Sequence, residues 1–318
     1  MRPKDYFLII NPTARSGKAK KTYRKVLGLL KKENADFDYT LTTNANEAIG
    51  LAITATEKGY KTIVAVGGDG TICETINGIL LAKKPEIKPK LGVIHTGTSP
   101  DFNKHHNIPV KIECAIKTLI SKKSRLIDLC RVEYYNDPQK KEKIVSYYAS
   151  NANIGLGPLI AQKANCRYRK YLGDTLGTLS AMLISLIKFP GVNLTIDIDG
   201  KKETLKGIIN LTIGKDPYLA SGMRIFCDIA GNDGRMFILY IKKSPLYRLI
   251  SNITGLYLGN ILNQKEAGIT YAQKVELNTD SDYALLEFDG DVRGYLPALI
   301  TVLPNKLEVI TDSFTIKR

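Results

Sequence analysis

Apolar residues along the first 130 positions follow two periods that alternate. Short apolar runs such as Tyr6 to Ile10, Thr62 to Val66 and Leu91 to Ile94 predict buried strands. Between these runs, apolar residues recur every three or four positions, as from Ile72 to Leu80, and this period predicts amphipathic helices. Asn46 is expected to cap one of them. Strands and helices in alternation indicate an α/β domain in which a parallel, doubly wound sheet has helices on both faces.

The pattern changes after residue 127, where strand-like runs follow one another. The clearest of these runs are Val192 to Ile198, Ile208 to Ile213, Met236 to Ile241 and Ile300 to Leu303. Turn sequences occur at Asp199-Gly200 and Asn232-Asp233-Gly234. We therefore expect an α/β domain over residues 1–127 and a mainly antiparallel, β-sandwich-like domain over residues 128–303. The segment from about 304 to 318 is expected to pack back on the first domain.

The chain carries a net charge of +15, and most of the surplus lies in its first 130 residues. Such a surplus favours anionic partners: nucleic acid, nucleotides or acidic lipid. No zinc-finger, RNP1 or KH pattern accompanies it, so nucleic acid is not an expected partner. No apolar run approaches the ~18 residues of a membrane span, and the N-terminus leads into a strand, so a cytoplasmic protein is expected. The five cysteines form no C-x-x-C pair, which argues against a disulfide framework or a zinc site.

A helical stretch at about residues 157–189 contains one local basic cluster. Its members are Lys163, Arg167, Arg169 and Lys170, and no acidic residue lies between Leu159 and Gly173. These side chains are candidates for contact with an anionic membrane surface. A solvated helix face is the alternative interpretation.

Three strands of the first half end in loops whose residues suit a phosphate group. The loops are Asn11-Pro12-Thr13, Gly67 to Thr71, and Thr96 to Phe102. Parallel sheets bind ligands at the carboxyl ends of their strands. Glycines allow close backbone approach, and the helix that follows the second loop offers N–H groups to an anion. Asp69 cannot hold a phosphate itself, so we expect it to hold a cation or a hydroxyl group; an aspartate cap in a tight turn is the alternative.

The ordered set of loops resembles the diacylglycerol kinase catalytic family, which includes bacterial diacylglycerol kinases, YegS-like lipid kinases and sphingosine kinases. Asn11-Pro12-Thr13, with Ser16-Gly17 after it, is similar to the N-P-x-x-G loop of the family. Gly67 to Thr71 matches G-G-D-G-T, and Gly97 to Phe102 is similar to G-T-x-N-D-F. Asp289-Gly290-Asp291 stands where the family has D-G-E. The resemblance covers nearly the whole chain.

The resemblance implies a kinase that uses ATP and Mg²⁺, with its active site in a cleft between two domains. The implied nucleotide-binding residues are Asn11, Thr13, Thr42, Gly67, Gly68, Gly70, Thr71 and Thr98. Asp69 would organise Mg²⁺ and the phosphates, and Asp101 and Asp128 would extend an acidic network. A helix N-cap is the alternative for Asp101, and a surface residue at a strand end is the alternative for Asp128. The general base of the family maps to Asp291.

Three positions depart from the pattern of the family. Asp291 replaces a glutamate, which shortens the side chain by one methylene group, and Pro100 replaces an asparagine. Gly214-Lys215 stands where many relatives have G-N. The resemblance also makes Asp233 a candidate ligand for a structural Mg²⁺ ion, with an Asp-Gly hairpin turn as the alternative. His105 and His106 are expected to be exposed residues at a helix end.

From the resemblance we expect the chain to be an ATP-dependent lipid kinase that acts on diacylglycerol or a related lipid alcohol. Its lipid would be reached by peripheral contact with the inner face of the membrane. A catalytically degenerate homologue that binds nucleotide or lipid as a regulator is the alternative, and an NAD kinase is a further one. The sequence leaves the oligomeric state open, a homodimer included.

Overall fold

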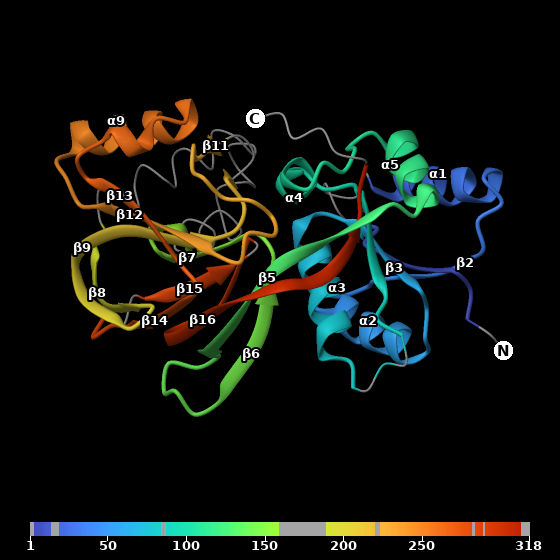
Figure 1. The fold of residues 1–318 in the computed structure, drawn as a ribbon, viewed down its shortest axis with the longest axis horizontal. Helices are drawn as coiled ribbons and strands as arrows, with labels where there is room; N and C mark the ends of the chain where they lie inside the picture. Colours follow the sequence, from blue (N-terminus) through green and yellow to red (C-terminus); the bar gives the residue numbers. More distant parts are fainter. Residues whose placement is uncertain are drawn as a thin grey trace. The chain divides into compact units, whose positions relative to one another are not determined.

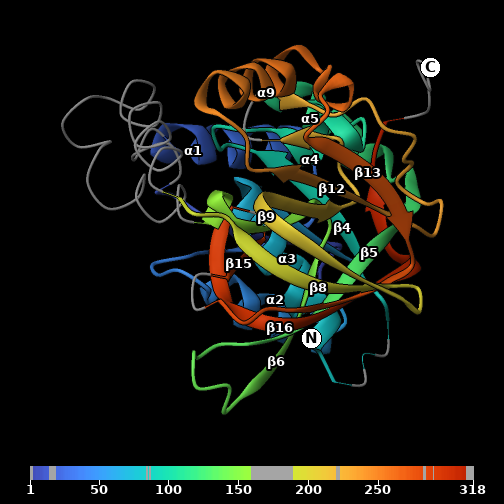
Figure 2. The ribbon, with the colours of Figure 1, turned by 90° about the vertical axis from the view of Figure 1, so that its left-hand side faces the viewer.

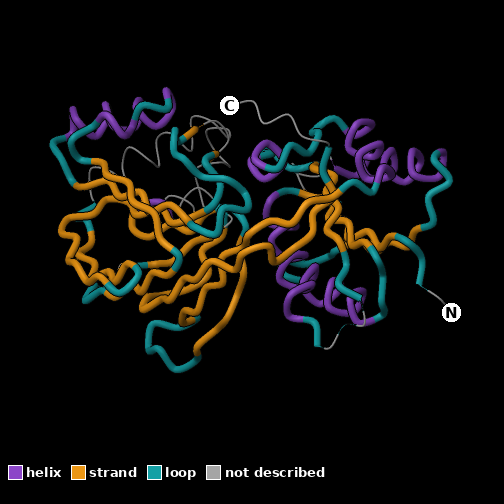
Figure 3. Tube along the Cα trace, in the orientation of Figure 1, coloured by secondary structure: helices purple, strands orange, loops and turns teal. Residues whose placement is uncertain are grey.

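The computed structural model describes residues 3–13, 19–83, 85, 87–158, 189–219, 223–281, 284–288 and 290–312. It divides into two compact units, one formed by Met1–Leu129 with Pro304–Arg318 and the other by Cys130–Leu303. The boundaries fall inside two long strands, β5 (Ser124–Tyr135) and β16 (Asp291–Ile310). Figure 3 shows the different make-up of the two units, with many helices in the first and mostly strands in the second.

The first unit is built on a parallel sheet. Strand β1 (Tyr6–Ile10) lies between β2 (Phe37–Leu41) and β3 (Thr62–Gly67), and β4 (Lys90–His95) pairs with the other edge of β3. The last strand of the chain completes this order, because Val309 of β16 pairs in parallel with Leu91 of β4. Strands β1, β3 and β4 are largely apolar and buried, as expected for strands covered on both faces, whereas β2 at the edge is only partly buried.

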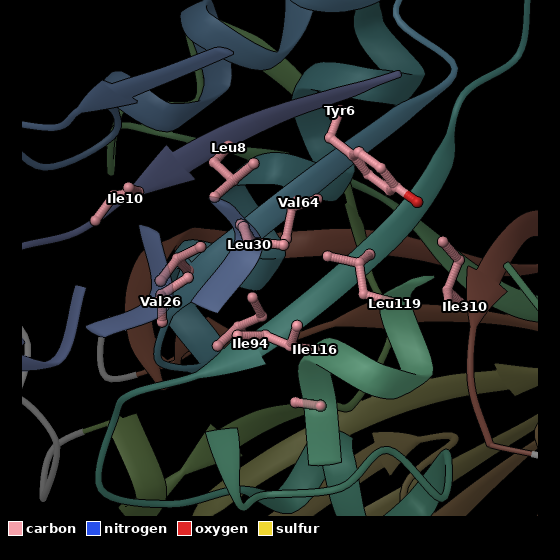
Figure 4. Close-up of a cluster of buried hydrophobic side chains, with 12 residues drawn as sticks. Tyr6, Leu8, Ile10, Val26, Leu30, Val64, Ile94, Ile116, Leu119 and Ile310 are labelled. Carbon is pink, nitrogen blue, oxygen red and sulfur yellow. The ribbon is translucent and has the colours of Figure 1, made fainter. Parts of the chain in front are cut away.

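Helices cover both faces of this sheet (Figure 1). One face carries α1 (Ala19–Lys32) and α5 (Ile112–Ser121), and the other carries α2 (Glu47–Glu57) and α3 (Asp69–Leu81). Successive strand residues point to opposite faces. Figure 4 shows the resulting core on the side of α1 and α5, where every second residue of β1 meets helix residues. Its labelled members are Tyr6, Leu8, Ile10, Val26, Leu30, Val64, Ile94, Ile116, Leu119 and Ile310.

The second unit is antiparallel in all of its described pairings. The strands within it are β6 (Lys143–Tyr148), β7 (Asn151–Gly155), β8 (Val192–Ile198), β9 (Lys201–Gly214), β10 (Tyr218–Leu219), β11 (Met223–Arg224), β12 (Met236–Lys242), β13 (Ala267–Ala272), β14 (Lys274–Asn278) and β15 (Leu285–Phe288). The pairings β9–β7–β15–β16–β14–β8–β9 close a ring, and β12 and β13 extend from β9. Helix α9 (Leu246–Leu258) lies over β12 and β13 (Figure 2).

The predicted fold class, a parallel α/β domain followed by a mainly antiparallel β domain, is confirmed. Two local expectations are wrong in detail. Asn46 stands before α2 with a φ of 64° and makes no capping hydrogen bond with its side chain; the Glu47 carboxylate instead accepts from the Thr43 amide at 2.6 Å. Strand β9 begins seven residues earlier than expected, because its Lys- and Glu-rich first part pairs with β8 at the surface. The helical stretch expected at 157–189 lies almost wholly outside the described residues.

Candidate functional site

The loops after β1, β3 and β4 lie side by side in the first unit. The backbone amide of Asn11 donates to the carbonyl of Val66 at 2.9 Å, and the amide of Thr96 donates to the carbonyl of Gly67 at 2.8 Å. These bonds continue the parallel hydrogen-bonding pattern by one residue beyond the ends of β1 and β4. The structure therefore brings together the three loops that the sequence singled out.

Asn11 connects its own loop to the start of α3. Its Oδ1 accepts hydrogen bonds from the amide and hydroxyl of Thr13, at 3.0 and 2.8 Å. Its Nδ2 donates to the Thr71 hydroxyl at 3.3 Å. One side chain thus holds a turn in the first loop and sets the distance from that turn to α3.

Two glycines at this site lie where a side chain could not fit. A β-carbon on Gly67 would stand 2.3 Å from the Thr71 hydroxyl oxygen, and one on Gly97 would stand 2.5 Å from the Cα of Gly68. The second contact is with backbone, which cannot rotate out of the way. The loops therefore approach at backbone distance beside the first turn of α3, whose N–H groups can bind an anion.

Asp69 is the first residue of α3, and its carboxylate faces His95 at the end of β4. His95 Nε2 lies 3.7 Å from Asp69 Oδ1, and the side chains are 1% and 23% exposed respectively. Our sequence reasoning did not single out His95. The available signal was a histidine that directly ends a buried strand before a Gly-Thr loop.

Mg²⁺ fits this arrangement when a nucleotide brings it. Mg²⁺ bound with a substrate phosphate takes one or two protein carboxylates and completes its shell with phosphate oxygens and water. Asp69, partly exposed beside the glycine loops, offers one such carboxylate. Within the described ranges, no group of three or more His, Cys, Asp or Glu side chains could hold a metal without such help.

The other two expected carboxylates of this unit have different partners. Asp101 begins the short helix α4 (Asp101–His105), accepts from the Ser99 hydroxyl at 2.6 Å and lies 3.5 Å from the Lys104 ammonium. Asp128 is only 1% exposed, so the surface interpretation is wrong, and its Oδ1 accepts from the amide of Asn305 at 2.9 Å. An acidic network that joins them to Asp69 stays a prediction.

The remaining expected residues of the first unit differ in exposure. Thr42 is buried, and its amide and hydroxyl both donate to the carbonyl of Ile10, at 2.8 and 3.4 Å. Thr98 is exposed, while Gly70 is half-buried within the first turn of α3.

The expectation of an exposed His106 is wrong, because its side chain is buried and its Nδ1 lies 2.9 Å from Arg125 Nη2. Burial lowers the pKa of Arg125.

Asp291 lies in the second unit, at the start of β16. It pairs with Phe288 across the β15–β16 hairpin, and its side chain is half exposed. Its Oδ2 accepts from the Arg293 guanidinium at 3.0 Å. A second carboxylate, Glu287, is buried in β15 and accepts from the amide of Gly290 and from Asn153 Nδ2, both at 2.8 Å. Glu287 therefore fixes the turn that leads to Asp291. Glu287 was not singled out from the sequence, although a single charged residue in an otherwise apolar strand could have indicated it.

Asp233 does not fit the structural Mg²⁺ ion that the resemblance implied. Its carboxylate accepts from four protein donors, and one of them is the ammonium of the buried Lys215, 2.5 Å away. A cation from the protein itself therefore already stands against this carboxylate.

The predicted membrane contact, Lys163, Arg167, Arg169 and Lys170, lies outside the described residues. Among the helices that the structure does describe, none has the length and apolar character needed to cross a membrane.

Known proteins are similar to this chain over nearly its whole length. Residues 5–132 match the diacylglycerol kinase catalytic domain, and residues 152–311 match the YegS C-terminal NAD kinase beta sandwich-like domain. The diacylglycerol kinase of Bacillus subtilis (strain 168) is 28% identical over 309 residues, 95% of each chain. The diacylglycerol kinase of Staphylococcus carnosus is 26% identical over 96% of this chain and 94% of its own.

Solved structures share the fold. A diacylglycerol kinase from Bacillus anthracis has a TM-score of 0.69 at 19% identity, covering 98% of both chains. A yeast NADH kinase has a TM-score of 0.52 at 11% identity, covering 98% of this chain and 84% of its own. At these identities the likeness concerns the fold alone.

Proposed function

Because this chain belongs to the family that joins a diacylglycerol kinase catalytic domain to a YegS-type C-terminal domain, we propose that it is an ATP-dependent lipid kinase. It transfers the γ-phosphoryl group of ATP to the hydroxyl group of diacylglycerol or a related lipid alcohol. The observation that carries the proposal is the set of three loops in the first unit, where Gly97 and Gly68 touch beside Asp69.

The phosphates of ATP bind to the glycine loops and the first turn of α3. The nucleotide-binding residues in this proposal are Asn11, Thr13, Thr42, Gly67, Gly68, Gly70, Thr71 and Thr98. Phosphoryl transfer depends mostly on positioning and on neutralisation of charge. Asp69 would hold the Mg²⁺ ion that arrives with ATP, and that ion would neutralise phosphate charge. His95, buried against Asp69, limits the directions in which this carboxylate can turn.

Asp291 is the proposed general base. It accepts the proton of the lipid hydroxyl as the oxygen bonds to the γ-phosphorus and ADP departs. The ion pair with Arg293 and the turn fixed by Glu287 hold this carboxylate in place. The lipid is reached at a membrane surface, where the net charge of +15 favours contact with anionic lipid.

The test is a transfer assay with labelled ATP, Mg²⁺ and vesicles that contain a panel of lipid alcohols. The wild-type protein is expected to label diacylglycerol or a related lipid, and Asp69→Asn is expected to abolish the labelling. Asp36→Asn, which changes an exposed aspartate of the same unit, is the matched control and should keep full activity. Absence of transfer to every lipid in the panel would refute the proposal.

Asp291 distinguishes an active kinase from a degenerate homologue. A misplacement near 1 Å can cost on the order of 10²-fold in rate. If Asp291 is adapted to its own lipid, Asp291→Glu should lower kcat by about that factor. Asp291→Asn removes the base altogether and should lower kcat by about 10²–10⁴-fold relative to the wild type. Both variants should unfold at the wild-type temperature, since this side chain is half exposed. A wild type without activity that gains it as Asp291→Glu would favour the degenerate homologue.

A further inference from the structure

Lys215 is a buried cation in the second unit. It directly follows β9, and its side chain is 1% exposed. Its Nζ donates to Asp233 Oδ1 at 2.5 Å and to the carbonyl oxygen of Arg235 at 2.7 Å. Both acceptors belong to the loop that leads into β12, the strand that pairs with β9. The ammonium thus joins the end of one strand to the start of its neighbour.

The Asp233 carboxylate has no acceptor site left for a metal ion. An ionised carboxylate offers about four lone-pair positions. Oδ1 accepts from Lys215 and, at 3.3 Å, from the Arg235 amide. Oδ2 accepts from the Ala230 amide at 2.9 Å and from Arg235 Nε at 3.2 Å. Each oxygen therefore has one backbone donor and one cationic donor.

The charged groups around this loop form ion pairs that stabilise the ionised Asp233 carboxylate. Burial alone would raise the pKa of Asp233, but the hydrogen bond from Lys215 and the donors of the loop hold it below its usual range. Arg235 also pairs with Asp228 at 2.8 Å. Cys227, in the same loop, has its pKa raised to about 12 by burial and by nearby carboxylates, with Asp216 first among them. The carboxylates of Asp228 and Asp233 thus lie in this loop, and Lys215 and Arg235 supply the opposite charge.

We propose that the Lys215 ammonium takes the place of a divalent cation in this loop. The ammonium stands between a carboxylate oxygen and a carbonyl oxygen, which are the ligand types that Mg²⁺ and Ca²⁺ prefer. The second unit consequently keeps its fold without a bound metal, and the divalent ion that the protein needs is the one that arrives with ATP. Removing the ammonium leaves these two oxygens free to bind a divalent ion.

The first arm of the test uses the wild-type protein without nucleotide. Thermal unfolding is recorded in EDTA and in millimolar Mn²⁺, and Mn²⁺ binding is measured from the EPR signal of the free ion. A ligand that binds only the folded state raises the unfolding temperature. We expect the same Mn²⁺ binding and the same metal-dependent shift in the wild type and in Asp233→Asn. Binding or a shift that the wild type shows and Asp233→Asn lacks would overturn the proposal.

The second arm uses Lys215→Asn, which removes the ammonium and leaves an amide. In EDTA this variant should unfold at a lower temperature than the wild type, because the Asp233 carboxylate, which is mostly buried, has lost one of its two cationic donors. Mn²⁺ should restore part of the loss and should bind with one more equivalent than in Lys215→Asn/Asp233→Asn. Lys206→Asn, an exposed change on β9, the strand that Lys215 follows, is the matched control and should behave like the wild type.

Equal behaviour of Lys215→Asn and the wild type in both measurements would also overturn the proposal. If Lys215→Asn fails to fold in EDTA, refolding in Mn²⁺ supports the proposal. If it folds in neither condition, the comparison of the wild type with Asp233→Asn decides by itself. None of these measurements depends on kinase activity, so their outcome is separate from that of the lipid assay.

Discussion

At the scale of single residues, the loops of the proposed nucleotide site depend on backbone atoms that lie too close together for a β-carbon. Gly97 and Gly68 belong to different loops, and a β-carbon on Gly97 would meet the Gly68 Cα at 2.5 Å. Side chains can move away from such a contact, but backbone cannot. Glycine at position 97 is therefore a geometric requirement of the site.

Gly97→Ala should separate the two loops. We expect a loss of about 1–3 kcal/mol in the free energy of unfolding, as for other overpacked sites, together with weaker binding of Mg²⁺-ATP. Gly50→Ala is the matched control: it lies inside α2 with nothing within 4 Å of the added carbon. That change should raise the stability by roughly 0.5–1 kcal/mol. Urea denaturation and nucleotide titration measure both effects, and equal stability of the two variants would contradict this account.

At the scale of elements, what could be predicted followed from strong local patterns. Strand β3 is apolar along its whole length and is buried on both faces, so its sequence alone indicated a central strand. The first part of β9 consists mostly of Lys, Glu and Thr, and its pairing with β8 makes it a strand. The contact of buried His106 with Arg125, and that of buried Asp128 with Asn305, depend on residues distant in sequence. The hydrophobic periodicity of the chain does not predict such contacts.

One contact between elements gives the first unit a pH dependence. The Tyr60 hydroxyl, at the entrance to β3, donates to Asp38 Oδ2 of β2 at 2.8 Å. Burial and this hydrogen bond raise the pKa of Tyr60 from 10.0 to about 12. The folded state thus holds the phenol proton more tightly than the unfolded state. The stability that this contributes is complete below pH 10 and is lost as the pH rises towards 12.

Tyr60→Phe should remove this dependence. The wild type is expected to lose roughly 2 kcal/mol of unfolding free energy from this group between pH 10 and pH 12. The variant should be less stable at neutral pH, by about 0.5–1.5 kcal/mol, and its curve should fall less steeply over that alkaline range. Tyr39→Phe, an exposed change on β2, serves as the control for general alkaline effects. Parallel curves for the wild type and Tyr60→Phe would show that this proton is not linked to folding.

At the scale of the whole molecule, the first unit is assembled from both ends of the chain. The three loops of the proposed nucleotide site all lie within the first 102 residues, but the end of β16 pairs with β4 and contributes Ile310 to the core beneath α1 and α5. Figure 4 shows Ile310 near Leu119, on the side of the sheet that carries α5. The first unit, to which we assign the proposed nucleotide site, therefore requires residues that follow the entire second unit in sequence.

Ile310→Ala tests this dependence. Truncation of a buried isoleucine costs about 2–5 kcal/mol, and Ile310 is only 2% exposed. Leu126→Ala, on the exposed side of β5 with 48% exposure, should change the stability by less than about 0.5 kcal/mol. Hydrogen exchange should reveal faster exchange of amides in β4 and α5 for Ile310→Ala, while β12 and β13 of the second unit keep wild-type rates. The loop at Gly97 directly follows β4, so Mg²⁺-ATP should also slow amide exchange in this loop less in Ile310→Ala than in the wild type. Unchanged exchange in β4 would mean that the C-terminal segment does not stabilise the nucleotide-binding unit.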